Sequence, residues 1–191
     1  MAKQKPTRGL NATNWLTAKG PLGMQACALK RGLSTRRLQL FVVACGDLIW
    51  DTMSTAQRRY FQALGRTAEG KDTQRDRDGL KTCGPLPKWL GWCIALGKKS
   101  ELKTAAADLA REVFGNPFRP VAFSPDWRTS TAVALAAQMY ESREFSAMPI
   151  LADALQDAGC DSDDVLNHCR AAGAMHVRGC WVVDLVLGRH E

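Results

Sequence analysis

Apolar residues recur at intervals of three and four along most of this chain, which is the spacing of one face of an α-helix. The clearest stripe lies within residues 34–50 and consists of Leu38, Phe41, Val42, Cys45, Leu48 and Ile49. Ser34 precedes the stripe and predicts an N-cap, because its hydroxyl can accept a hydrogen bond from a free backbone N–H. A second helix is predicted to start after Ser54 and to run toward Gly65.

Further helices are predicted along the rest of the chain, and no alternating pattern of useful length indicates a strand. Their predicted ranges are 88–96, 100–114, 129–142, 146–158, 162–171 and 177–187. The pattern therefore predicts an all-α protein, an irregular helical bundle of about eight helices.

Three stretches interrupt the helical pattern. Residues 1–10 are basic and aperiodic and are expected to form a flexible tail. Residues 70–88 combine charges, glycines and prolines and predict a linker, and the Pro-rich residues 116–126 predict an extended segment. The expected organisation is a basic helical half, 11–98, followed by an acidic helical half, 99–191, that holds a Cys/His cluster.

Composition changes this picture mainly through charge. The 191 residues are 46% hydrophobic and 24% charged, which is typical of a globular chain. Residues 1–99 hold 18 Lys and Arg against 6 Asp and Glu, a net charge of +12, whereas residues 100–191 hold 8 against 13, a net of −5. Two interpretations stay open: the basic half binds an anionic partner, or the two halves attract each other within one fold.

Paired arginines near two helix starts favour a phosphate-binding interpretation of the basic half. Arginines there oppose the helix dipole, a placement that makes sense if phosphates approach the same helix ends. A basic-aromatic stretch follows, and aromatic rings among cations can stack on unpaired bases. The candidate nucleic-acid contacts are Arg36, Arg37, Arg58, Arg59, Lys88, Trp89, Lys98 and Lys99. The alternative is a solvated arginine face with the tryptophan in the core.

A cluster of sulfur and imidazole side chains marks the C-terminal half as a candidate metal site. Cys160, Cys169, His176 and Cys180 could form a Cys3His tetrahedral zinc site, with His168 as the substitute ligand. His176 and Cys180 are four residues apart and share a helix face if the helix begins at or before His176.

Two other interpretations of this cluster stay open. Buried cysteines are common without any metal, so the cluster could simply pack, with hydrogen-bonded histidines. A cysteine nucleophile is the other alternative, with Cys180, His176 and Asp184 along one helix face. That line lacks a neighbouring oxyanion hole, which an acyl-transfer site needs.

The chain shows no export signal and no apolar run near the ~20 residues of a membrane-spanning helix. We therefore expect a cytoplasmic protein without membrane contact, in which the seven cysteines are reduced thiols or metal ligands.

Four segments resemble a family of uncharacterised proteins of planctomycete-type bacteria. STRRLQLFVVACGDLIW resembles the family's opening helix, and REVFGNPFRPVAFSPDW, PILADALQDAGCDSDDVLNHCR and HVRGCWVVDLVLG resemble its shared C-terminal region. One departure is Cys45-Gly46-Asp47, where members tend to have Cys-Cys-Arg. The resemblance implies no activity.

These observations together predict a non-catalytic cytosolic binding or adaptor module with a zinc-stabilised C-terminal half and a protein partner. A nucleic-acid-binding protein that uses the basic half is the first alternative, and a Cys-dependent enzyme is the second.

Overall fold

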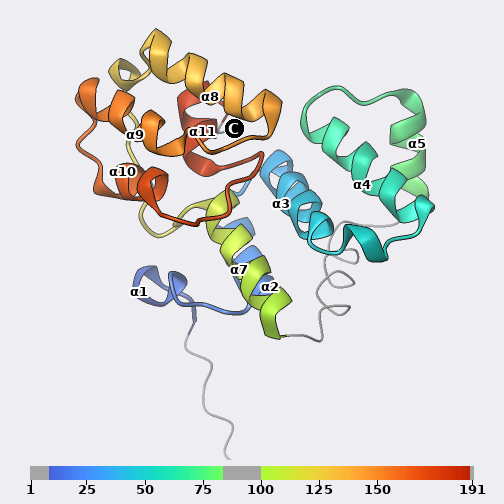
Figure 1. The fold of residues 1–191 in the computed structure, drawn as a ribbon. Helices are drawn as coiled ribbons and strands as arrows, with labels where there is room; N and C mark the ends of the chain where they lie inside the picture. Colours follow the sequence, from blue (N-terminus) through green and yellow to red (C-terminus); the bar gives the residue numbers. More distant parts are fainter. Residues whose placement is uncertain (1–8, 84–99, 190–191) are drawn as a thin grey trace, which may run out of the picture.

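A computed structural model describes residues 9–83 and 100–189, and that part of the chain is helical without strands, which confirms the all-α prediction (Figure 1). The α-helices in chain order are α1 (Ala12–Trp15), α2 (Pro21–Lys30), α3 (Thr35–Asp47), α4 (Thr55–Ala68), α5 (Gln74–Cys83), α7 (Ser100–Phe114), α8 (Ser130–Ser142), α9 (Met148–Asp157), α10 (Asp163–Arg170) and α11 (Trp181–Leu187). Short 3-10 turns lie at Trp50–Thr52 and Pro125–Trp127. The predicted helix 88–96 lies outside the described residues.

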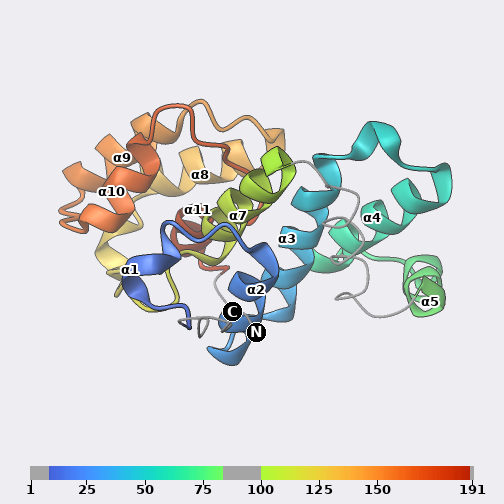
Figure 2. The same cartoon turned by 90° about the horizontal axis from the view of Figure 1, so that it is seen from below.

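The helices enclose two hydrophobic cores that meet along α7 and α11. The first core is formed mainly by α2, α3, α4 and α7, and the second by α8 to α11. Figure 1 shows the second group of helices on one side of α7 and the α3–α5 group on the other, and Figure 2 shows α1 and α2 across the lower side. Helix α7 packs with the N-terminal helices in the first core.

The capping chemistry read from the sequence sets the helix starts. Ser34 Oγ accepts from the Arg37 N–H at 3.3 Å, and Ser54 and Gln57 form a reciprocal capping box at the start of α4. Thr129 caps α8 in the same way, through the Ala132 N–H.

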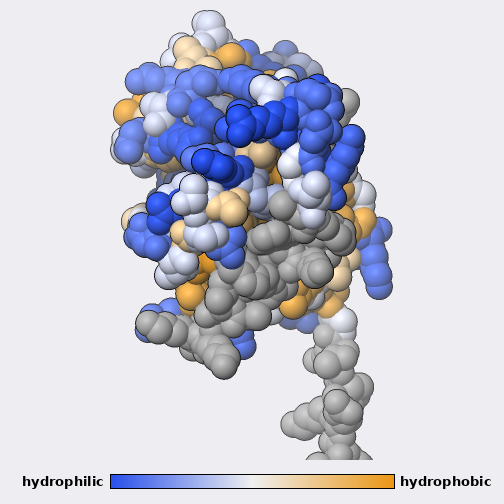
Figure 3. All heavy atoms as spheres, turned by 90° about the vertical axis from the view of Figure 1, so that its right-hand side faces the viewer, coloured by the Kyte–Doolittle hydropathy of each residue, from blue (hydrophilic) through white to orange (hydrophobic). Residues whose placement is uncertain are grey.

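The predicted linker at 70–88 is wrong in part, because α5 forms within it. The helix is too polar to show an apolar stripe, and its start is held by polar contacts instead. Asp76 accepts hydrogen bonds from the Thr73 N–H at 2.9 Å and from Arg66 at 2.6 and 3.0 Å. The face that α4 and α5 turn outward is largely hydrophilic in its upper part (Figure 3).

The last helix starts later than the sequence predicts, at Trp181 instead of residue 177. Gly179 adopts φ +90°, a left-handed conformation that is incompatible with an α-helix, so α11 cannot begin before it. A Cβ at this position would lie 3.0 Å from Leu40, so the glycine also lets the loop approach α3 closely. The condition for a common helix face of His176 and Cys180, a helix that begins at or before His176, is therefore not met, because His176 lies in the preceding loop.

The proline-rich segment is non-helical until the turn at Pro125–Trp127, as expected. Within residues 9–83 and 100–189, every helix falls short of the length and hydropathy that a bilayer crossing requires.

Candidate metal centre

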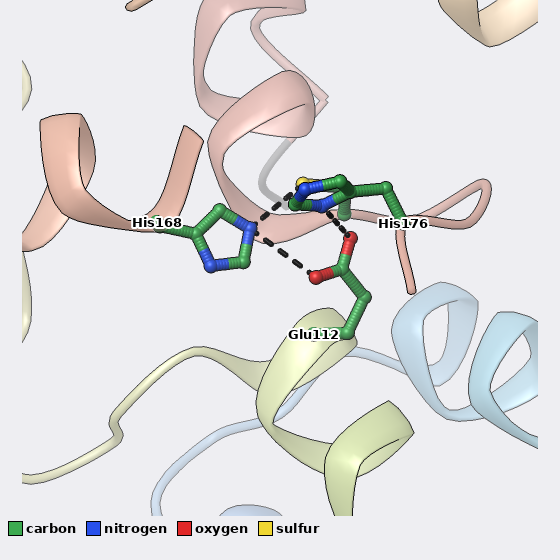
Figure 4. Close-up of side chains that lie close together, drawn as sticks. Glu112, His168 and His176 are labelled. Atoms are coloured by element: carbon green, nitrogen blue, oxygen red, sulfur yellow. Dashed lines mark hydrogen bonds and ion pairs between the residues drawn. The ribbon is translucent and has the colours of Figure 1, made fainter. Parts of the chain in front are cut away.

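Four ligand-bearing side chains from both cores converge where α7 meets the C-terminal segment. Glu112 comes from the last turn of α7, His168 from α10, His176 from the loop before α11, and Cys180 from the N-cap of α11. Figure 4 shows the Glu112 carboxylate between the two imidazoles. One donor atom from each residue lies within 4.8 Å of the other three.

The carboxylate of Glu112 is the centre of this group. Its Oε1 lies 3.1 Å from His176 Nδ1 and its Oε2 lies 3.2 Å from His168 Nε2. The Val177 N–H also donates to Oε1, at 3.4 Å. Burial disfavours the charged form, but the contacts with the two histidines outweigh it and lower the pKa of Glu112 to about 2.

Cys180 completes the group as a buried thiol. Its Sγ lies 3.2 Å from His168 Nε2, and the side chain is fully enclosed. Burial, together with the Glu112 charge, raises the pKa of Cys180 well above its usual range. A free thiol here is therefore protonated at neutral pH, which is the opposite of what a cysteine nucleophile needs.

The second nitrogen of His168 fixes its tautomer in the metal-free arrangement. The Trp181 indole N–H donates to His168 Nδ1 at 3.2 Å, so Nδ1 carries a lone pair and the neutral ring carries its proton on Nε2. That proton points to Glu112 and Cys180. The ring must move it to Nδ1 before Nε2 can bind a metal, and two N–H donors would then face each other unless the indole shifts.

The donor atoms lie near, but not at, the spacing of a tetrahedral site. Zinc bonds to nitrogen, oxygen and sulfur predict ligand-to-ligand separations of ~3.3–3.7 Å. The neighbouring separations here are 3.1 to 3.2 Å, and all lie within 4.8 Å. The group can therefore hold a metal ion after small movements of its side chains.

The structure brings together three of the five residues that the sequence indicated as ligands. His168, His176 and Cys180 belong to the group, whereas Cys160 and Cys169 lie outside it. Both of these cysteines are buried in the second core, and burial raises the pKa of Cys169 to about 12. His168, which the sequence indicated only as a substitute ligand, therefore belongs to the group, whereas the predicted ligands Cys160 and Cys169 do not.

Glu112 is the member that sequence reasoning missed. It lies 56 positions before His168, within a predicted helix whose charged residues read as a solvated face. The only signal was its place one residue before the apolar pair Val113 and Phe114, both of which are buried. A glutamate inside a buried stretch of helix indicates a partner, because an unpaired carboxylate there is costly.

The alternative catalytic arrangement of Cys180, His176 and Asp184 is not present in the structure. Asp184 is engaged by Arg36, with Nη1 to Oδ2 at 2.6 Å and Nη2 to Oδ1 at 3.2 Å, and His176 is engaged by Glu112. Cys180, His176 and Asp184 therefore do not form a relay.

The candidate nucleic-acid residues are dispersed. Arg36 is committed to Asp184 and Tyr140, and Arg58 donates to the Trp50 carbonyl while lying over its ring. Arg59 is exposed, and Arg37 lines a cavity between the cores. Lys88, Trp89, Lys98 and Lys99 lie outside the described residues.

His168 and His176 line different cavities, which gives the group two approaches from solvent. His168 lines a cavity of about 480 Å³, and His176 lines one of about 690 Å³ beside α3 and α4. Glu112 and Cys180 line neither.

The chain matches no protein-family model, no curated protein and no solved structure. The chemistry of the site is therefore argued from its geometry alone.

Proposed function

We propose that this protein is a non-catalytic helical binding module in which a zinc ion, held by Glu112, His168, His176 and Cys180, joins the two cores. The observation that carries the proposal is the convergence within 4.8 Å of four donor atoms, from two buried and two half-buried residues on elements that belong to different cores. Such a bond between α7 and the C-terminal segment would contribute directly to folding, because the site does not exist in the unfolded chain.

Charge balance and donor type support zinc. Imidazole nitrogens and a thiolate suit a borderline ion, whereas magnesium and calcium prefer oxygen ligands alone. With Glu112 ionised and Cys180 deprotonated by the metal, a divalent ion makes the buried site neutral. Four protein ligands also leave no open position for a water or substrate, which favours a structural role over a catalytic one.

The partner that we favour for the module is a protein. Leu22 and Leu29 are seven residues apart on α2, share a face, and expose 47% and 41% of their surface. Leu16, just before α2, is 59% exposed. Two exposed leucines on one face of α2 support contact with another polypeptide. Nucleic-acid binding is not part of the proposal, since Arg36 is engaged internally.

Zinc content and stability test the proposal together. Protein purified without chelator should contain about one zinc per chain, and chelation should lower its melting temperature. Cys180→Ser should lose most of the metal, whereas Cys169→Ser is the matched control: it changes a buried cysteine of the same core and should keep the metal. Metal-free protein that melts at the same temperature with and without added zinc would contradict the zinc centre.

The partner part is tested separately with Leu22→Ser/Leu29→Ser. This double variant should keep its zinc and its circular dichroism spectrum but lose capture of the protein partner, because only the exposed face of α2 changes. Undiminished capture would rule out that face as the contact.

A further inference from the structure

A cavity of about 480 Å³ lies between the two cores, on a side of His168 that the metal ligands leave free. Its walls come from α1, the end of α2, the start of α3, the end of α7 with the segment that follows it, and helices α10 and α11. The volume is in the range of pockets that bind small molecules.

The lining is strongly cationic. It contains the four arginines Arg31, Arg37, Arg111 and Arg119, against the single carboxylate of Asp164. Arg119 lies 3.4 Å from Asp164, and Arg111 pairs with Asp108 at 2.6 Å while donating to two backbone carbonyls. Within the described residues, Arg31 and Arg37 have no carboxylate in an ion pair.

Arg37 is the most informative of the four. Its side chain makes no hydrogen bond or ion pair with any residue in the described ranges, and its Nε is buried without an acceptor. Burial lowers the pKa of Arg37, and the nearby Asp184 only partly opposes that effect while Arg36 adds to it. A buried guanidinium donor without an acceptor is rare in folded proteins and calls for a ligand that supplies one.

The remaining walls indicate what the rest of such a ligand looks like. Trp15, Phe114 and Trp181 line the cavity, together with aliphatic side chains. Arg31 lies over the Phe118 ring at 4.0 Å, which holds its guanidinium beside the cavity without neutralising it. The cavity thus combines unpaired cations with apolar aromatic walls.

We propose that this cavity binds a small organic anion whose carboxylate or phosphate group pairs with Arg37 and Arg31 and whose apolar part lies against Trp15 and Trp181. The planar guanidinium fork fits both kinds of anion with two parallel hydrogen bonds. The proposal goes beyond the zinc centre and does not rest on it, because neither arginine belongs to the metal-binding group.

Calorimetric titration of the full chain at low salt with benzoate, phenyl phosphate and inorganic phosphate tests this pocket. One of the two aromatic anions should bind at a single site and more tightly than inorganic phosphate, and the comparison of benzoate with phenyl phosphate distinguishes a carboxylate from a phosphate ligand. Arg37→Met should weaken that binding about tenfold or more, because the paired charge is lost. Arg59→Met is the matched control: it removes an exposed arginine of α4 that does not line the cavity, and it should bind as the unchanged protein does.

Stability without ligand separates a binding role of Arg37 from a structural one. Because its charge is unpaired, Arg37→Met should melt at the same temperature as the unchanged protein or higher, while losing the stabilisation that the anion gives. Equal binding by Arg37→Met, or no binding of any probe at millimolar concentration, would overturn the proposal. If Arg37→Met does not fold, Arg31→Gln decides: a loss of about tenfold supports the pocket and unchanged affinity overturns it. Chelator-treated protein, titrated in parallel, shows whether zinc loss and anion binding are separate.

Discussion

Two buried carboxylates, Glu112 and Asp184, link the two cores in opposite directions. Glu112 extends from α7 of the first core to the histidines of the second. Asp184 extends from α11 of the second core to Arg36 on α3 of the first. Both carboxylates are enclosed, with exposed fractions of 5% and 0%.

The partners of these two carboxylates differ in kind. Asp184 faces an arginine, which keeps its charge at any pH that proteins experience. That arginine also donates to the Tyr140 hydroxyl at 2.7 Å, and Tyr140 donates in turn to Glu69. Glu112 instead faces two histidines and a thiol, whose protons can leave and whose lone pairs can bind a metal. The first link is therefore an ion pair that offers no metal-binding lone pairs besides its carboxylate, whereas the second can also hold a metal. Burial raises the pKa of Asp184, so acid weakens the first link as well.

The Arg36–Asp184 link should show the largest effect when it is broken. Asp184→Ala leaves the half-buried Arg36 with only the more distant Glu69 carboxylate, at 3.7 Å, and should lower the free energy of unfolding by about 3 kcal/mol, measured by urea denaturation. The double variant Arg36→Met/Asp184→Leu removes both charges and should be more stable than Asp184→Ala. A single variant that unfolds at the same urea concentration as the unchanged protein would show that the pair contributes nothing.

The contribution of Glu112 to the free energy of unfolding should be lost in acid. Because the folded pKa of Glu112, about 2, lies below its ordinary 4.5, its contribution is complete above pH 4.5 and disappears as the pH falls toward 2. In metal-free protein this loss is on the order of 3 kcal/mol. Glu112→Gln should flatten that part of the stability curve. A curve of equal slope in both proteins would assign the acid loss to other carboxylates.

A smaller effect is expected at Gly115, which ends α7 next to the Glu112 cluster. Its φ is +64°, and a Cβ there would lie 3.2 Å from the Trp181 ring. Gly115→Ala should cost about 1–2 kcal/mol from the left-handed backbone and displace the indole from His168. Tryptophan fluorescence and zinc content measure the second effect. Gly173→Ala is the control, since it has φ +72° but open space around it.

The smallest and sharpest effect concerns Trp181 itself. Trp181→Phe removes the N–H that faces His168 Nδ1, so metal-free protein should lose about 1 kcal/mol of stability. The same change lets Nδ1 hold a proton while Nε2 binds metal, so zinc affinity should rise or stay equal, as measured by competition with a chelating dye. Weaker zinc binding by this variant would contradict the tautomer that we assign to His168.

The hydrophobic pattern predicted most helices because their stability comes from one buried face each. Helices α3, α4, α7 and α8 follow their predicted ranges closely. Helix α5 was missed because polar contacts among Arg66, Thr73 and Asp76 hold its start, and such contacts leave no periodic trace.

The candidate site was predictable only in its local part. His168, His176 and Cys180 lie within 13 residues, so their proximity follows from chain connectivity. Cys160 and Cys169 were equally close in sequence, but they face the second core instead. Glu112 is distant in sequence and reaches the site because α7 packs against α11. The spacing of residues along the chain does not predict that contact.

The sequence by itself thus determined the helical class, the starts of α3, α4, α7 and α8, and the position of a sulfur- and imidazole-rich segment, because these depend on neighbours a few residues apart. The tertiary structure alone decided which buried groups meet. It placed Arg36 against Asp184, Glu112 against the two histidines, and Arg37 in a cavity without a partner. The physical reason is that charge pairing inside a protein is set by the packing of whole helices, which joins residues far apart along the chain.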